Sequence, residues 1–184
     1  MPYSKSHKEN SRRRILDSAV KLFSANGYDG VTLDELMQDA KLTRGAFYAH
    51  FDSKQTLYTE AVLHAACHGP VTALNGDADE ATVKTMVRAY LDMSHVKQQG
   101  AICPLAFLVT DVANQQNEIR DTYTQVYRDV IERINTLPMI GDMDSALAIS
   151  ALMIGGVAVA RALNDEELSK RLLEACYKTS ERLM

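Results

Sequence analysis

The chain has 184 residues, of which 46% are hydrophobic and 24% are charged, so it can bury a core and is not expected to be disordered. Its formal net charge of −4 argues against a uniformly basic surface of the kind that binds nucleic acid or anionic membranes. The first fourteen residues contain no apolar run, so we expect no secretory signal, and three cysteines without a C-x-x-C pair favour a reducing cytoplasm.

The apolar residues recur at three- and four-residue intervals without sustained alternation, which predicts an all-α fold of about nine helices. The first helix presents an apolar face between Ile15 and Phe23 and ends at Gly27, where glycine supplies a left-handed residue. Thr32 and Glu35 have the spacing of a capping box and start a short helix that continues to about Gln38.

The rest of the chain is also predicted to be helical, interrupted most clearly at residues 69–79 by Pro, Gly, Asn and Asp. Pro104 suits the first turn of a helix, because the N–H that it lacks has no partner there. Helices are expected at residues 44–48 after an N-cap at Thr43, then at 54–67, 80–97, from 104 onward, 118–135, 145–163 and 165–183, with Asn164 and Glu167 capping the last.

The two short helices, separated by residues 39–42 and preceded by a longer helix, form a helix-turn-helix arrangement. The second of them, residues 44–48, is the reader helix that we expect in the major groove of DNA. Residues 1–14 carry a net charge of +4, whereas residues 61–184 carry −5. The basic side chains are therefore concentrated where a flexible arm can reach phosphates or the minor groove.

Several elements lie at fixed spacing within residues 12–66, namely Gly27-Tyr28 followed by Thr32, the run TRGAFY at 43–48, and His50-Phe51 before Ser53-Lys54. With these elements in order, the chain resembles the TetR/AcrR family of bacterial transcriptional regulators. The resemblance implies a helix-turn-helix DNA-binding domain with a basic N-terminal arm at residues 1–53 and an effector-binding and dimerisation domain at residues 54–184. It also implies a repressor that binds a pseudo-palindromic operator as a homodimer, and not an enzyme or a cofactor-dependent protein.

The resemblance also implies which side chains touch DNA. Thr32 matches a phosphate contact, Arg44 a bidentate contact to guanine, and Ala46 a contact to a thymine methyl group. Arg12 and Arg13 are added because the N-terminal arm is basic. The alternative to a phosphate contact is that they are only the solvated start of a helix. The full set is Arg12, Arg13, Thr32, Thr43, Arg44, Ala46, Tyr48, His50 and Lys54. Lys41 stands where the family commonly has glycine, so either Lys41 adopts a positive φ or the turn differs.

Residues 145–160 form the longest uncharged stretch, and sixteen residues are fewer than the roughly 18–20 that cross a bilayer. A helix that is apolar all round must be buried on all sides. We therefore expect this helix and the last one to join their symmetry mates in a four-helix bundle. The predicted dimer interface comprises Ala151, Ile154, Gly155, Val159 and Leu172.

Aromatic and sulphur-containing residues of the central helices can line an effector pocket, although apolar stripes more often form core. The candidates are Met86, Tyr90, Cys103, Phe107, Tyr123 and Tyr127. Cys103 precedes Pro104 at a helix start, where the helix dipole lowers a thiol pKa, so a thiol-reactive effector is one hypothesis and a buried hydrophobe the alternative.

Three other functions are alternatives to a ligand-released repressor. His64, Cys67 and His68 share one helix face, a spacing that permits metal sensing, although no fourth ligand is identified and no metal site is predicted. A constitutive DNA-binding protein without effector is the second alternative. An enzyme would need Cys103 as its nucleophile, but no catalytic motif accompanies it.

Overall fold

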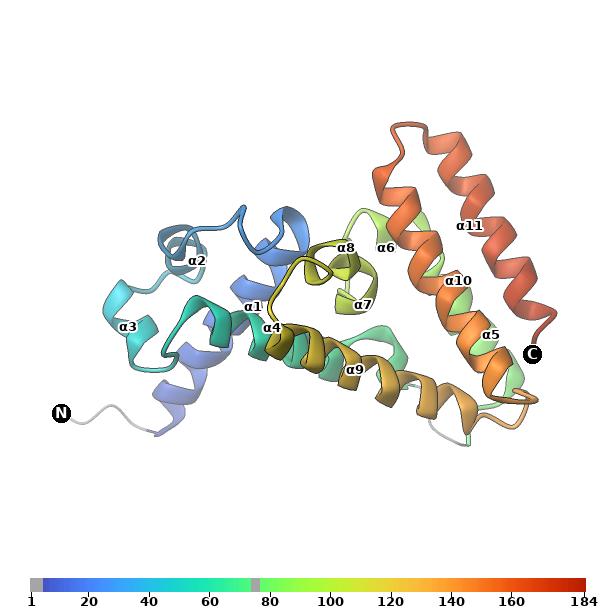
Figure 1. The fold of residues 1–184 in the computed structure, drawn as a ribbon, viewed down its shortest axis with the longest axis horizontal. Helices are drawn as coiled ribbons and strands as arrows, with labels where there is room; N and C mark the ends of the chain where they lie inside the picture. The colour runs from blue at the N-terminus through green and yellow to red at the C-terminus, as the bar shows by residue number, and fades with distance from the viewer. Residues whose placement is uncertain (1–4, 74–76) are drawn as a thin grey trace.

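The structure, a computed structural model, describes residues 5–73 and 77–184, and within these ranges it is helical without any strand (Figure 1). The prediction of an all-α fold is confirmed. The elements are α1 (Lys5–Asn26), α2 (Leu33–Asp39), α3 (Arg44–Tyr48), α4 (Lys54–His68), the 3-10 helix η1 (Pro70–Ala73), α5 (Glu80–Tyr90), α6 (Met93–Val96), α7 (Pro104–Phe107), α8 (Val109–Val112), α9 (Asn117–Asn135), α10 (Met143–Ala162) and α11 (Glu166–Glu181).

The described residues form eleven α-helices instead of about nine, because two expected helices are broken in the middle. The predicted helix at 80–97 stops at Leu91, whose ψ of 43° leaves the helical region. The Asp92 side chain then accepts a hydrogen bond of 2.8 Å from Ser94 N and starts α6, as aspartate does when it competes with the helix for backbone N–H groups. Leu108, with φ −113° and ψ 1°, separates α7 from α8 without a side-chain cap.

Aspartate side chains also set the start of the last two helices. Asp142 accepts a hydrogen bond of 2.7 Å from Ser145 N, so α10 begins two residues earlier than expected. Asp165 accepts one of 2.9 Å from Leu168 N and is the N-cap of α11, which corrects the expected pairing of Asn164 with Glu167. The middle of the expected breaker, residues 74–76, lies outside the described residues.

The helix-turn-helix elements and the two C-terminal helices lie at opposite ends of the molecule (Figure 1). α1 and α4 pack against each other and carry the buried core from one end toward the other, and α4 also packs against α9. α10 packs against α11, α9, α7 and α6. The division at residue 53 stays a prediction, since Leu57 and Tyr58 of α4 are buried in the same core cluster as Ile15 and Phe23 of α1.

The turn between α2 and α3 depends on a residue with positive φ. Lys41 has φ 53°, so the first of the two alternatives for this position is the observed one. A left-handed conformation costs a non-glycine residue about 1–2 kcal/mol. Arg14 of α1 offsets part of this cost, because its Nη2 donates hydrogen bonds to Ala40 O at 2.6 Å and to Lys41 O at 3.2 Å.

α10 has 20 residues and contains an 18-residue window with a mean hydropathy of 1.8, so its length and composition would permit it to cross a membrane, contrary to the expectation from its sixteen uncharged residues. The core helix of a soluble protein has the same properties. Ile149, Met153 and Val157 of α10 are buried among the neighbouring helices. The fold therefore accounts for the apolar side chains on this face of α10.

Candidate nucleic-acid interface

The N-terminus of α2 is held by the predicted capping box. Thr32 N donates to Glu35 Oε2 at 2.7 Å, and Glu35 N donates to Thr32 Oγ1 at 3.2 Å. The hydrogen bond from the Thr32 backbone, followed by that from its hydroxyl, lowers the pKa of Glu35. The Thr32 hydroxyl also donates to the same carboxylate at 2.7 Å, so it is engaged locally in the absence of DNA.

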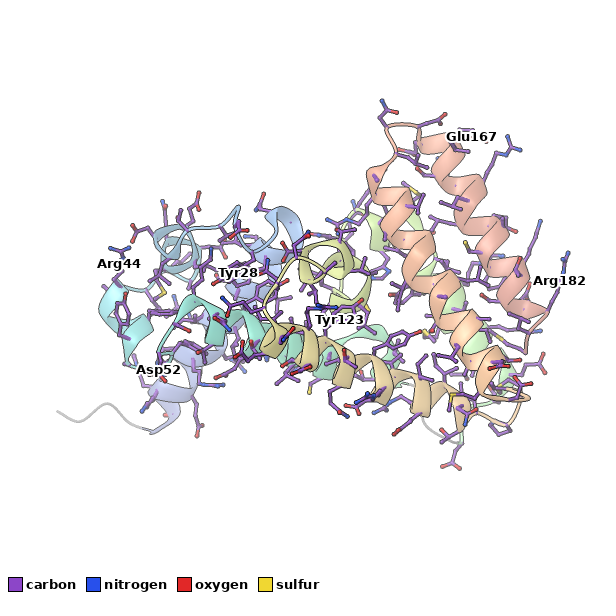
Figure 2. The ribbon with its side chains drawn as sticks, in the orientation of Figure 1. Tyr28, Arg44, Asp52, Tyr123, Glu167 and Arg182 are labelled. Carbon is purple, nitrogen blue, oxygen red and sulfur yellow. The ribbon has the colours of Figure 1, made fainter. Side chains whose placement is uncertain are left out.

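The start of the reader helix, α3, is exposed. Thr43 occupies the N-cap position with an extended backbone, and its side chain makes no capping hydrogen bond. Arg44 Nε lies 2.8 Å from Asp34 Oδ1 of α2, with both side chains more than half exposed. Figure 2 shows Arg44 at the outer end of the molecule. An exposed ion pair of this kind contributes only about 0–1 kcal/mol, so Arg44 can exchange it for another partner.

Tyr48 is the most exposed large hydrophobic residue of the described chain, at 65%. Its ring packs edge-on against Phe47 with the centroids 5.1 Å apart, and Phe47 in turn lies 5.8 Å from Phe51. Phe47 and Phe51 are buried in the core. Ala46 is half-buried against the same core. Tyr48 is therefore an exposed aromatic side chain whose ring packs against the buried Phe47.

His50 is half-buried and hydrogen-bonded to α1. Its Nε2 lies 2.8 Å from Ser11 Oγ, while its buried Nδ1 has no hydrogen-bond partner. Burial, together with the charges of Lys8 and Arg12, lowers the pKa of His50. A neutral imidazole contacts phosphate as a hydrogen-bond donor and not as a cation. A cavity of about 830 Å³ opens beside it, between the first half of α1 and the α2–α3 turn.

The three predicted basic contacts outside α3 have different surroundings. Lys54 is half-buried, and its Nζ donates to Tyr28 O at 2.6 Å and lies 4.3 Å from the centre of the Tyr28 ring. Arg12 pairs with Glu60 of α4. Arg13 is exposed and has no ion pair or hydrogen bond with the described part of the chain. Arg13 is thus the basic side chain of this group that is free to meet a phosphate.

The basic residues of the expected flexible arm belong largely to a helix. α1 begins at Lys5, so residues 5–14 are helical, whereas residues 1–4 lie outside the described residues. The basic side chains are therefore carried on the first turns of α1, which Figure 1 shows at the same end as α3.

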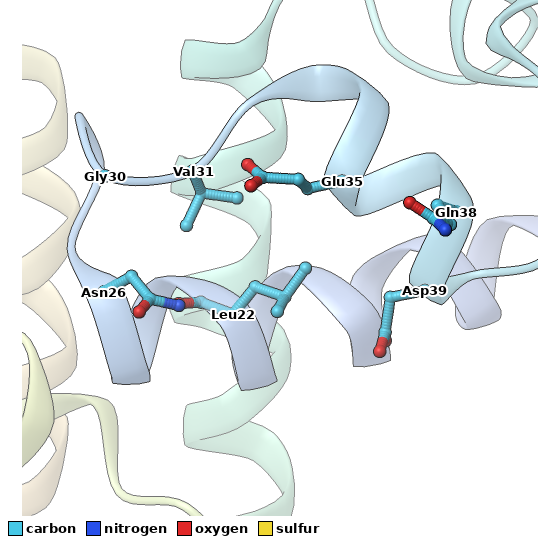
Figure 3. A pocket seen from close by; sticks show the side chains of 7 residues that line it. All are labelled: Leu22, Asn26, Gly30, Val31, Glu35, Gln38 and Asp39. Carbon is cyan, nitrogen blue, oxygen red and sulfur yellow. The ribbon is translucent and has the colours of Figure 1, made fainter.

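Sequence reasoning missed the residues that position α2. Asp39 at the end of α2 accepts hydrogen bonds of 2.5 Å from Ser18 Oγ and from Lys21 Nζ of α1, which lower its pKa. A groove of about 420 Å³ between α1 and α2 is lined by Asp39 and Glu35 (Figure 3). Both carboxylates are already hydrogen-bonded within the protein, and these bonds hold the two ends of α2 in place. The groove is not part of the DNA-facing surface that we propose. Partners 18 and 21 residues apart leave no local signal in the sequence.

The predicted effector residues lie in the interior of the C-terminal part. Tyr90, Cys103 and Phe107 are buried, and burial raises the pKa of the Cys103 thiol above its ordinary value. The remaining three, Met86, Tyr123 and Tyr127, are partly buried against the core. Tyr123 OH donates to Leu105 O at 2.7 Å, and the buried Tyr90 OH is hydrogen-bonded with the Cys103 thiol. A role in effector binding stays a prediction.

The two histidines of the metal-sensing alternative are hydrogen-bonded to other groups. His64 Nε2 lies 2.7 Å from Asp17 Oδ1, and His68 Nδ1 lies 2.7 Å from the His64 carbonyl oxygen. Within residues 5–73 and 77–184, no three His, Cys, Asp or Glu side chains are grouped so as to hold a metal ion.

The chain is similar to known proteins both in its N-terminal part and over most of its length. Residues 15–61 match the family model described as bacterial regulatory proteins, tetR family. The biofilm operon icaADBC HTH-type negative transcriptional regulator IcaR of Staphylococcus aureus (strain Newman) is 43% identical over 49 residues, which are 27% of this chain and 26% of IcaR. The match thus spans about a quarter of that relative.

Two further similarities extend over most of the chain. The HTH-type transcriptional regulator SrpR of Pseudomonas putida is 28% identical over 158 residues, covering 81% of this chain and 74% of SrpR. The crystal structure of the reduced form of NemR from E. coli superposes with a TM-score of 0.74 at 22% identity, covering 94% of this chain and 96% of that one. The second similarity concerns the fold.

Asp34→Asn is expected to strengthen DNA binding about two- to fivefold, because it releases Arg44 from an ion pair worth up to about 1 kcal/mol. Fluorescence anisotropy with a duplex selected from a random pool measures the effect. Asp52→Asn is the matched control, since Asp52 is exposed in the same part of the chain and has no ion pair with Arg44. Equal gains for the two variants would show that the ion pair does not compete with DNA.

Acid is expected to destabilise the protein through His50. The folded pKa lies below the unfolded value of about 6.5, so the unfolded chain takes up the proton first and the free energy of unfolding falls as pH decreases from 7 to 5. Urea unfolding at the two pH values measures this loss, which should be smaller in His50→Asn. An unchanged loss in that variant would assign the pH dependence to other groups.

Proposed function

Because the chain belongs to the tetR family of bacterial regulatory proteins, we propose that it is a homodimeric repressor that binds a pseudo-palindromic operator and is released by an effector. It is a DNA-binding transcription factor and not an enzyme. The carrying observation is the exposed start of α3, with Arg44 and Tyr48, at the opposite end of the molecule from an exposed apolar face on α10 and α11. A cytoplasmic location goes with this function.

The reader helix α3 is proposed to enter the major groove. Thr43 and Arg44 at its N-terminus and Tyr48 at its other end are all exposed. α3 has five residues and spans only about 7 Å, so one copy reads few base pairs. Two copies related by a two-fold axis read two half-sites spaced by the dimer.

The proposed dimer surface is an apolar stripe along α10 and α11. Val159 is 49% exposed and Leu168 46% exposed, although both are large aliphatic residues. A Cβ added at Gly155 would meet no atom within 4 Å, whereas one at Gly156 would lie 3.1 Å from Cys176 Sγ. Gly155 thus faces outward and Gly156 packs inside the protomer. The stripe comprises Leu147, Ala151, Ile154, Gly155, Ala158, Val159 and Ala162 of α10 with Leu168, Leu172 and Ala175 of α11.

Release by a small-molecule or thiol-reactive effector is proposed to act through the interior of the C-terminal part. The buried Nε2 of His95, whose ring packs against Tyr90 and Phe107, has no hydrogen-bond partner among the described residues. It supports a polar ligand there, because a buried polar atom that lacks a hydrogen bond is costly. The competing function is a constitutive DNA-binding protein. Selection of DNA from a random pool, followed by a search for compounds and oxidants that release it, separates the two, since a constitutive binder is released by none.

Val159→Glu is expected to dissociate the dimer, because it buries a carboxylate at the centre of an apolar interface. Sedimentation at micromolar concentration should show a monomer, and affinity for operator DNA should fall at least about a hundredfold with the loss of two-site binding. The matched control is Leu63→Glu, the same charge placed on a 44% exposed leucine of α4 away from the stripe. A Val159→Glu protein that remains dimeric would refute the proposed interface.

Arg44 and Arg13 are expected to contribute to DNA binding in different ways. Arg44→Ala should relax preference at particular base pairs at a cost of about 1–3 kcal/mol, as loss of a base contact does. Arg13→Ala should weaken binding to all sequences alike and reduce the slope of log K against log salt by about one. Binding titrations over several salt concentrations with selected and scrambled duplexes distinguish them. A uniform loss in both variants would make Arg44 a phosphate contact.

A further inference from the structure

Asp111 of α8 joins the C-terminal part of the chain to the N-terminal part. Its Oδ1 accepts a hydrogen bond of 3.1 Å from Tyr28 N, in the loop between α1 and α2. Its Oδ2 accepts one of 2.5 Å from Tyr58 OH of α4, and Tyr58 is completely buried. The Asp111 carboxylate thus connects α8 to the loop between α1 and α2, and to α4. The loop belongs to the helix-turn-helix region, and α4 packs against α1 beneath it.

The loop that receives Asp111 is fixed on both sides. The Tyr28 carbonyl accepts the hydrogen bond from Lys54, and the Tyr28 ring packs edge-on against Tyr58 at 5.2 Å. Gly27 has φ 74°, and a Cβ at this position would lie 2.8 Å from Asp111 Oδ1. The close approach of the carboxylate therefore requires glycine here, both for the conformation and for the space.

A second connection ties the end of α1 to α10, the helix of the proposed dimer surface. Arg161 Nη2 donates to Ser24 O at 2.9 Å, and Arg161 Nη1 donates to Phe107 O at 3.3 Å. Gln98 Nε2 donates to the same Ser24 carbonyl at 3.1 Å. Figure 1 shows α7 and α8 between the end of α1 and α10, so both connections cross the same region.

A pocket open to solvent lies beside these connections. A cavity of about 500 Å³ is lined by Ser24 and Gly27 from one side and by Phe107, Asp111 and Arg161 from the other. Hydrogen bonds are directional, whereas apolar contacts are not, so these polar groups restrict the relative orientation of the segments that they join.

We propose that Asp111 is a positioning residue that sets the orientation of the helix-turn-helix region relative to the dimer, and thereby the half-site spacing that the protein accepts. The inference rests on the proposed function, because spacing has a meaning only for a dimer on a two-part operator. Asp111 touches no DNA in this arrangement and acts through Tyr28 and Tyr58.

The test compares four proteins on one set of duplexes. Asp111→Ala removes both acceptors, and Tyr58→Phe removes one donor while keeping the ring. Asp129→Ala is the matched control, an exposed carboxylate on α9 that bonds only Gln125 of its own helix among the described residues. The duplexes carry the half-sites that the wild-type protein selects from a random pool, with the spacer lengthened or shortened by one or two base pairs, and anisotropy gives each affinity. Circular dichroism and sedimentation verify that each variant is folded and dimeric.

The wild-type protein and Asp129→Ala should lose about tenfold or more in affinity for each base pair of altered spacing, an effect comparable to a mismatched base pair. Asp111→Ala should lose less than about threefold, and Tyr58→Phe should be intermediate, so that spacing preference weakens while base preference within each half-site is kept. If folded Tyr58→Phe and Asp111→Ala both keep the wild-type spacing profile and bind only uniformly more weakly, the inference is refuted and the proposed function stands. If the wild-type protein selects no two-part site, the proposed function fails, and this inference with it.

Discussion

The hydrogen bond between Tyr58 and Asp111 is the buried polar contact that joins α8 to α4, next to the helix-turn-helix region. A phenol hydroxyl in the core needs an acceptor, because leaving it unpaired costs about 1–3 kcal/mol. The acceptor comes from α8, 53 residues away along the chain. Burial, followed by the hydrogen bond to Asp111, raises the pKa of Tyr58, so its proton stays in place. Three segments therefore meet at Asp111, namely α8, α4 and the loop between α1 and α2.

The helix-turn-helix region shows a similar use of polar groups. α2 and α3 have seven and five residues and are too short to be stable alone. Arg14 and Asp39 attach the end of α2 to α1, and the buried rings of Phe47 and Phe51 attach α3 and the following turn to the core. The exposed surface of α2 and α3 makes weaker contacts, such as the ion pair between Arg44 and Asp34, and DNA can replace them.

The net charge of −4 results from two regions of opposite sign, and the fold separates them in space. The basic residues of α1 lie at the end that carries α3, whereas residues 61–184, with a net charge of −5, include the opposite end. A body of negative charge facing away from phosphates favours approach with the reader helix first. An average over the sequence conceals this arrangement.

The sequence by itself determined the features that depend on neighbours in the chain: the all-α class, the capping box at Thr32, the end of α1 at Gly27, and the helix-turn-helix string. Each is decided within a few residues by backbone geometry and side-chain hydrogen bonds. The predicted dimer residues Gly155 and Val159 of α10 are outward-facing, and their role in an interface stays a prediction, whereas the breaks at Leu91 and Leu108 were missed.

Only the tertiary structure decided which polar groups are already engaged. Lys54 donates to Tyr28, Arg12 pairs with Glu60, and Asp111 reaches a backbone N–H 83 residues away. Partners so far apart follow no period or spacing, because they are chosen by which surfaces the packed helices bring together. A charged or polar residue in the sequence shows what it can bond, and burial and distance in the fold decide what it does bond.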